Sequence, residues 1–432
     1  MSPRVRAAVH RTFSSVRGSR NFRLYLSGQF VSALGTWMNF TASSWLVLKL
    51  THGSGTALGV NSALAFGPVL VLGAWGGVLA DRVDKRKILV TTQAAYTVVA
   101  LTLSALVFSG GIQLWMVYLL SVASGLITSM DNPARQSFYV EMVGEETLTN
   151  AVSLNSAAFT GARVIGPAVA GILIATVGMA ICFAVDGVSY LAVLGALLAM
   201  RPDELHRQRR TTREKGHLTA GIRYVWRTDE LRRPLLVMAV VFTFVFQWQV
   251  LVPLMAERAF LAGARQFGFM SAAAGLGSFV AALLMANRNA QPSMRRLATF
   301  AVAVGLAMIG VALSPNLWVA VAAMVPVGFF AMSFMINGNT MLQLAARPEA
   351  RGRVMALYGV VFLGSTPIGG PIVGLLGEHL GPRKDFVAAG LVAVVIGISV
   401  LWARQRAAAG AAEDAAVAVE QDQTQANVGV VT

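Results

Sequence analysis

Long apolar segments recur along almost the whole chain, separated by short polar stretches. Each is close to the roughly 20 residues that an α-helix needs to cross the hydrocarbon core of a bilayer. Their continuous apolar character favours helices over the strands of a membrane barrel, which alternate between two faces. The pattern predicts an all-α polytopic membrane protein with twelve transmembrane helices, at 24–48, 57–80, 88–109, 112–132, 149–178, 179–200, 234–257, 267–287, 296–314, 316–340, 353–379 and 385–403.

Composition supports a membrane location over a nucleic-acid partner. The chain is 56% hydrophobic and 13% charged, whereas soluble domains are about 25% charged. Its net charge of +15 would suit nucleic acid, so the positions of the basic residues decide. With the N-terminus taken as cytoplasmic, 29 of the 35 Lys and Arg residues fall in segments on that side and five on the other. This asymmetry is typical of membrane topology and predicts two cytoplasmic termini and no nucleic-acid partner.

The longest polar stretch divides the chain into two halves. We expect a basic cytoplasmic N-terminus at 1–23, a six-helix bundle at 24–200 and a cytoplasmic linker at 201–233. A second six-helix bundle follows at 234–403. The tail at 404–432 has few large apolar residues, and we expect it to be disordered.

The two halves also repeat each other. Three pairs of segments match in the same order at offsets of 204 to 207 positions: VLADR (Val78–Arg82) with LMANR (Leu284–Arg288), SMDNPARQ (Ser129–Gln136) with INGNTMLQ (Ile336–Gln343), and Gly166-Pro167 with Gly370-Pro371. A duplicated six-helix unit is a recurring plan of secondary transporters, in which the substrate path lies between the repeats.

One loop carries a family signature. GVLADRVDKRKIL (Gly77 to Leu89) resembles the motif that follows span two in the major facilitator superfamily, with Asp84 where a second glycine is usual. The resemblance implies that Asp81 is a gating residue surrounded by basic side chains and that the glycine permits close helix contact. The alternative interpretation is positive-inside topology alone. The implied gating group consists of Gly77, Asp81, Arg82, Lys85 and Arg86.

A second resemblance lies in span five. GARVIGPAVAG (Gly161 to Gly171) is similar to the Gly-Pro motif of the superfamily's exporter branch. Gly166, Pro167 and Gly171 allow a kinked, closely packed helix, which is also what ordinary helix packing requires. The likeness covers roughly 21–404 and is closest to twelve-span bacterial exporters of siderophores, macrolides and other drugs.

That likeness implies a monomeric secondary active transporter in the bacterial cytoplasmic membrane. It would export a small amphipathic molecule by alternating access, with protons as the coupling ion. An importer of the same fold, or a membrane sensor or scaffold that transports nothing, are the alternatives.

Charges within spans are functional hypotheses because an ionisable group in hydrocarbon is costly. Arg163 lies midway along span five, and Asp186 lies about two turns into span six. They could form a buried ion pair, although their depths differ. Asp186 is a candidate proton carrier; a structural role is the alternative. Proton-coupled exporters of the superfamily often carry an arginine in span four, and the stretch Trp115–Met130 contains none, while Asp131 is expected at the membrane interface.

Polar side chains in three other spans are candidates for lining a substrate cavity, with hydrogen bonding between helices as the alternative. These candidates are Trp37 and Asn39 in span one, Gln247 and Gln249 in span seven, and Asn337 and Asn339 in span ten.

Recognisable catalytic and cofactor motifs are absent from the sequence. There is no Walker-type GxxxxGK[ST], HExxH or GxSxG pattern, and the single cysteine, Cys182, rules out a cysteine-based metal site. We therefore expect no enzymatic activity, no cofactor and no metal.

Overall fold

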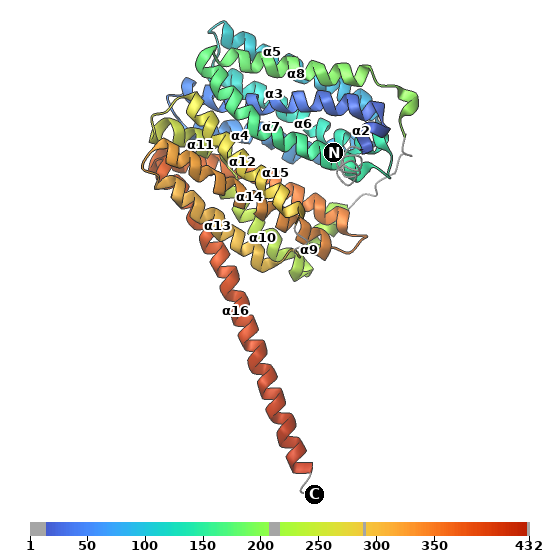
Figure 1. The fold of residues 1–432 in the computed structure, drawn as a ribbon, viewed down its shortest axis with the longest axis vertical. Coiled ribbons are helices and arrows are strands. Elements are labelled where there is room, and N and C mark those ends of the chain that lie inside the picture. Colours follow the sequence, from blue (N-terminus) through green and yellow to red (C-terminus); the bar gives the residue numbers. More distant parts are fainter. Residues whose placement is uncertain (1–13, 207–216, 288–290, 430–432) are drawn as a thin grey trace, which may run out of the picture.

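The computed structural model describes residues 14–206, 217–287 and 291–429, which contain helices and no strands. Figure 1 shows long helices packed side by side, with the last helix leaving the body of the molecule. The first half comprises α2 (Ser14–Gly18), α3 (Arg20–Leu50), α4 (Gly55–Arg82), α5 (Lys85–Phe108), α6 (Leu114–Val143), α7 (Leu148–Thr176) and α8 (Met179–Leu198). The linker contains η1 (Pro202–Glu204) and α9 (His217–Arg227). The second half comprises α10 (Asp229–Phe244), α11 (Trp248–Leu254), η2 (Met255–Ala259), α12 (Ala264–Asn287), α13 (Met294–Ala312), α14 (Leu317–Ala345), α15 (Arg351–Leu380) and α16 (Pro382–Gly429).

Eleven described segments are long and apolar enough to cross a membrane. The remaining predicted span, the first one at 24–48, corresponds to α3, which has 31 residues but is less apolar than the others. Its polar residues point into the protein: Asn21, Ser32 and Thr41 are all buried. A helix that is polar on its protein-facing side still spans a bilayer when neighbouring helices satisfy its polar groups.

The packing pattern repeats between the halves. In the first half, α3 packs against α7 and α8, α4 against α6, and α5 against α6 and α8. In the second half, α10 packs against α15 and α16, α12 against α14, and α13 against α14 and α16. Each pair is the counterpart of the other under the internal repeat. The prediction of two pseudo-symmetric six-helix bundles is confirmed.

The most extensive contacts between the halves are those of α4 with α15 and of α7 with α12, and α11 also packs against α3 and α4. We call the end of the molecule with the α3–α4 and α15–α16 connections the far end, and the opposite end, near α2 and α9, the terminal end (Figure 1). At the far end the backbones of α4 and α15 meet through glycines, Gly55 against Gly374 and Gly59 against Gly370. Within the described residues, the hydrogen bonds between the two halves also lie at the far end.

The span predicted at 234–257 is interrupted. α10 ends at Phe244, and α11 starts at Trp248 with Gln247 as its N-cap residue. A π-helical turn then continues from Met255 to Ala259. Pro253 lies inside α11 and donates no backbone hydrogen bond. Broken helices are tolerated at membrane depth where they are buried in protein, as Gln247 is here, at 2% exposure.

The predicted disorder of the tail differs from the structure, in which α16 continues as one helix to Gly429 (Figure 1). The tail is rich in alanine and contains glutamate and glutamine, all of which are good helix formers. A helix that extends an existing one also avoids the cost of nucleation.

Candidate functional site

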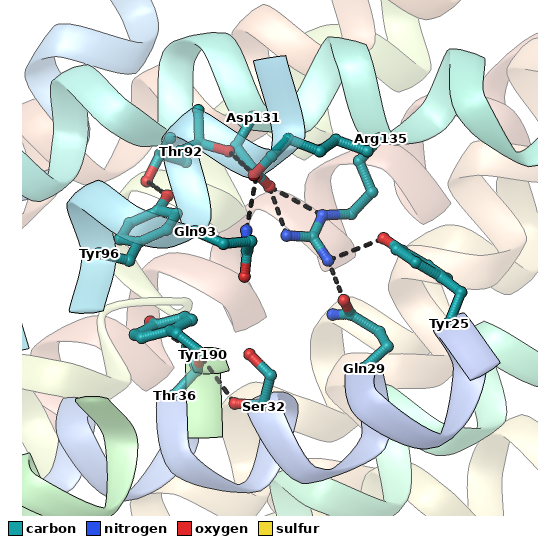
Figure 2. Close-up of polar contacts among 12 residues, drawn as sticks. Tyr25, Gln29, Ser32, Thr36, Thr92, Gln93, Tyr96, Asp131, Arg135 and Tyr190 are labelled. Carbon is teal, nitrogen blue, oxygen red and sulfur yellow. Dashed lines mark hydrogen bonds and ion pairs between the residues drawn. The ribbon is translucent and has the colours of Figure 1, made fainter. Parts of the chain in front are cut away.

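An ion pair is buried inside the first half. Arg135 and Asp131 lie one turn apart on α6, with Arg135 Nη2 at 2.6 Å and Nε at 2.8 Å from Asp131 Oδ2. The second carboxylate oxygen of Asp131 accepts hydrogen bonds from Thr92 Oγ1 at 2.7 Å and Gln93 Nε2 at 2.9 Å, both on α5. Figure 2 shows these side chains converging on the carboxylate. Asp131 is therefore a fully bonded interior charge and not the interfacial residue that the sequence suggested.

The guanidinium of Arg135 connects α6 to α3. Its Nη1 donates to the Tyr25 hydroxyl at 2.9 Å and to Gln29 Oε1 (Figure 2). Breaking a buried pair of this kind by removing one partner typically costs about 3–5 kcal/mol. The pair therefore holds α3, α5 and α6 in one arrangement.

A set of hydroxyl side chains extends from this pair toward the middle of the bundle. The Tyr96 hydroxyl lies 2.7 Å from Thr128 Oγ1, and its ring stacks on Tyr190 of α8 at 5.0 Å between centroids. The Tyr190 hydroxyl in turn lies 3.3 Å from Thr36 Oγ1 of α3 (Figure 2). Hydroxyls can both donate and accept, so such a set can exchange hydrogen-bond partners while all of its members stay neutral.

Asp186 lies beyond the tyrosines, fully buried on α8. Asn39 Nδ2 donates to Asp186 Oδ2 at 2.6 Å, and Ser43 Oγ donates to Asn39 Oδ1 at 3.0 Å. The Oδ1 atom of Asp186 has no hydrogen-bond partner. A side chain at Gly35 would collide with Asp186, so this glycine lets α3 and α8 approach closely.

Arg163 and Asp186 do not form an ion pair. The Arg163 guanidinium lies over the ring of Trp37, 5.3 Å from its centroid, while Asp186 bonds to Asn39. Trp37 and Asn39 are two positions apart on α3 and so lie on nearly opposite faces of that helix. The two charges are thus on different sides of α3.

The signature loop closes the terminal end of the first half. Lys85 Nζ lies 2.5 Å from Glu141 Oε1 of α6. Arg86 donates to the carbonyls of Leu197 and Leu198, the last residues of α8, where a cation is favoured by the helix dipole.

The other members of the motif differ in their surroundings. Asp84, the departure from the motif, caps α5 by accepting from the Lys87 amide at 3.2 Å. Arg82 is exposed, and the side chain of Asp81 lies outside the described residues. Gly76, next to Gly77, makes a close helix contact, since an added side chain there would meet the Ser129 carbonyl of α6.

The Gly-Pro motif lies on two helix contacts. A Cβ at Gly166 would be 2.6 Å from Trp37 Cβ of α3. Gly171 faces Ala264 and Gly268 of α12, and Gly268 also faces the Pro167 carbonyl. The motif therefore packs α7 both within its own half and against the other half.

The candidate cavity residues serve several purposes. Asn39 makes the inter-helix bond to Asp186, and Asn337 bonds the backbone of Ser293 in the loop before α13. Gln247 donates to the Phe242 carbonyl at the break in span seven, with its Oε1 unpartnered. Asn339 accepts from Gln343, Gln249 is half-buried, and the Trp37 indole nitrogen is buried without a partner.

Arg135 is the residue that sequence reasoning missed. Span four was predicted to end at 132, which placed Arg135 in a loop, but α6 continues to Val143 and carries it inside the protein. The signal was the spacing of Ala134, Phe138 and Met142, which recur every four residues and are all buried. The first glycine after Met130 is Gly144, which ends the helix with φ at 71°.

Comparisons with known proteins agree on the family. The model of the transmembrane secretion effectors, a family of the major facilitator superfamily, matches residues 12–429. Among curated proteins, the chain is 23% identical to the staphyloferrin A transporter of Staphylococcus aureus over 384 residues, covering 87% of this chain and 94% of the relative. It is 27% identical to the multidrug efflux pump Tap of Mycolicibacterium fortuitum over 397 residues, covering 87% and 93%. The enterobactin exporter EntS of Escherichia coli is 26% identical over 385 residues, covering 88% and 91%.

Solved structures show the same fold at lower identity. The nucleoside transporter NupG aligns with a TM-score of 0.72 at 10% identity, covering 88% of this chain and 98% of NupG. A bacterial homologue of the lysosomal transporter Spinster, inward-facing and unoccupied, aligns with a TM-score of 0.68 at 15% identity, covering 89% and 97%. With its matching family model and its two packed six-helix bundles, the chain belongs to the transmembrane secretion effector family and is a multi-pass membrane transporter of the major facilitator superfamily.

Proposed function

We propose that the protein exports a small amphipathic molecule, in the class of drugs, siderophores or secondary metabolites, by exchanging it for protons. The two bundles alternate between opening at the terminal end and opening at the far end, with cargo bound between them. Both termini lie in the cytoplasm and the terminal end faces it, as the distribution of Lys and Arg supports. Export is the direction given in the names of two relatives, the enterobactin exporter and the multidrug efflux pump.

The contacts between the halves support an inward-facing state. Glu378 of α15 accepts hydrogen bonds from Ser54 Oγ at 2.9 Å and from the Thr56 amide at 2.8 Å, at the start of α4. Lys49 and Glu257 form an ion pair beside them at 3.4 Å. Together with the glycine contacts between α4 and α15, these bonds close the far end. A transporter in this state would accept cargo from the terminal side.

The observation that carries the proton-exchange proposal is the isolation of Asp186. It is fully buried, one carboxylate oxygen has no partner, and the other accepts a hydrogen bond from the neutral amide of Asn39 on α3. An uncompensated charge at such a depth costs several kcal/mol. Loss of the proton therefore requires water, a cationic group or a rearrangement of the helices, and this requirement couples protonation to conformation.

The Asp131–Arg135 pair has a positioning role in this proposal. Its charges already compensate each other, and its bonds to Tyr25 and Thr92 join three helices. When the first half rocks against the second, these three helices would move together as one rigid body. Asp186, and not Asp131, is the proton carrier.

Cargo movement in membrane vesicles separates a transporter from a sensor that only retains the fold. Everted vesicles given a lipophilic cationic dye in the outer medium should accumulate it when the protein is present. Asp81→Asn should abolish this accumulation at an unchanged protein level, because the resemblance assigns Asp81 to the gate. Accumulation only in right-side-out vesicles would identify an importer. Accumulation that needs neither the protein nor Asp81 would contradict the proposal.

A further inference from the structure

A second isolated carboxylate lies in the other half, at the far end. Asp385 is in the first turn of α16 and is 1% exposed. Neither of its side-chain oxygens has a hydrogen-bond partner. Buried polar groups are nearly always bonded, so a carboxyl group with two unpartnered oxygens calls for a functional explanation.

Asp385 lies directly behind the seam between the halves. Its Oδ2 is 2.8 Å from the position that a Cβ at Gly377 of α15 would occupy. Leu254 Cδ1 is 3.0 Å from that same position and also 3.0 Å from the Cβ position of Gly55, on α4 of the other half. One leucine side chain thus separates the carboxyl group from the seam. The next residue on α15, Glu378, makes the bonds that close the far end.

The charged groups of the far end are engaged elsewhere. Arg383 Nη1 donates to the carbonyls of Ala312 and Ser314 and its guanidinium packs on Phe260. Lys49 pairs with Glu257, whose neighbour Arg258 packs beside Gly53. His379 Nδ1 lies 3.0 Å from the Leu375 carbonyl on the surface, and Lys384 is exposed.

The helices packed against α16 add no compensating charge. The ionisable residues of α10 and α13 are all near the terminal end of those helices, and α11 has none. No cluster of His, Cys, Asp or Glu able to hold a metal occurs among the described residues. A metal ion would need several such ligands, whereas a proton needs one oxygen.

We propose that Asp385 is a second proton-binding site, which holds its proton while the far end is closed and releases it when that end opens to water. Ionised Asp385 would be an unpaired charge behind the α4–α15 seam. Release of the proton therefore favours separation of the seam and hydration of the carboxylate. The proposal rests on the proposed function only for alternating access; it requires neither cargo nor Asp186.

The single cysteine makes a direct test available. In a Cys182→Ser, Asp186→Asn background, which leaves Asp385 as the only proposed proton site, Ser62→Cys places one thiol on the face of α4 that meets α15. Ser62 is 3% exposed, and its Cβ lies 3.2 Å from the position that a Cβ at Gly370 would occupy. The reaction of this thiol with a membrane-impermeant maleimide is measured in proteoliposomes between pH 5.5 and 8.5. Ser109→Cys, in an exposed far-end loop, identifies the accessible side and corrects for the reactivity of the thiol itself.

The corrected labelling rate should rise with pH, approaching about tenfold per pH unit, the limit for one linked proton. In this background Asp385→Asn should remove the dependence, whereas His379→Gln should keep it. A flat profile with Asp385 intact would overturn the proposal even if Asp385→Asn failed to fold. So would a slope that persists when Asp385→Asn is added. None of these outcomes bears on whether Asp186 drives export.

Discussion

Asn39 and Asp186 join α3 to α8 through a 2.6 Å hydrogen bond in the interior of the first bundle. Replacing Asn39 with Leu leaves the carboxyl group without this partner and should lower the free energy of unfolding by about 1–3 kcal/mol. Replacing both residues with Leu should restore most of that loss, because two apolar side chains leave nothing unsatisfied. Thermal unfolding of the purified protein in detergent measures both effects. Equal destabilisation by the single and double replacements would show that the bond does not matter.

Arg135→Ala should destabilise the protein by about 3–5 kcal/mol, because Asp131 would remain as an uncompensated buried charge. Arg135→Lys should lose less, since it keeps the charge but not the planar fork that reaches Asp131, Tyr25 and Gln29 together. The melting temperatures of the two variants and the parent provide the measurement. An Arg135→Ala variant as stable as the parent would contradict the position of Arg135 in the bundle interior.

The glycine contacts between α4 and α15 predict a conformational effect of one added methyl group. Gly59→Ala would place its Cβ against the Gly370 backbone, so it should weaken closure of the far end. Gly67→Ala, on the same helix, has nothing within 4 Å of the new Cβ and is the matched control. Accessibility of a thiol at Ser62, which faces Gly370 of α15, should rise several-fold in Gly59→Ala and stay at the parent value in Gly67→Ala. Equal accessibility in both would argue against a glycine-mediated seam.

The Lys85–Glu141 pair tests what the signature loop does apart from Asp81. Its side chains are 17% and 11% exposed, so the pair is largely removed from water. A double-mutant cycle with Lys85→Gln and Glu141→Gln should give a coupling energy of about 0.5–3 kcal/mol. Arg201–Glu204, which is 62% and 41% exposed, is the matched surface pair and should give about 0.2–1 kcal/mol. A coupling energy no larger than that of the surface pair would indicate that Lys85 contributes only to the positive-inside topology.

Hydropathy and repetition were sufficient to predict the helical fold, since long apolar runs in a bilayer have few structural solutions. They failed at Arg135 because a hydropathy count treats every arginine as polar, whatever its partner. Asp131, four residues earlier, neutralises it, and the helix continues. That partner could have been proposed from the i, i+4 spacing.

The sequence could place Asp186 on a helix but could not select its partner. Arg163 and Asn39 were both available, and the choice depends on which faces of α3 meet α7 and α8. Asp385 was overlooked because it lies beside Arg383 and Lys384, at the predicted start of the last span, where a charged residue is ordinary. Its burial arises from the contact of α16 with Gly377 of α15, which no local pattern reveals.

The proposed function depends above all on the exchange of cargo for protons through Asp186. The most direct measurement is dye movement in proteoliposomes under an imposed pH gradient, with parent protein, Asp186→Asn and the exposed control Asp203→Asn. With the parent protein and with Asp203→Asn, we expect uphill dye movement that depends on the imposed pH gradient. In Asp186→Asn the driven component should fall by about tenfold or more, equivalent to at least 1.4 kcal/mol of lost coupling. Dye movement that does not depend on the pH gradient, or that is unchanged in Asp186→Asn, would contradict proton exchange through Asp186.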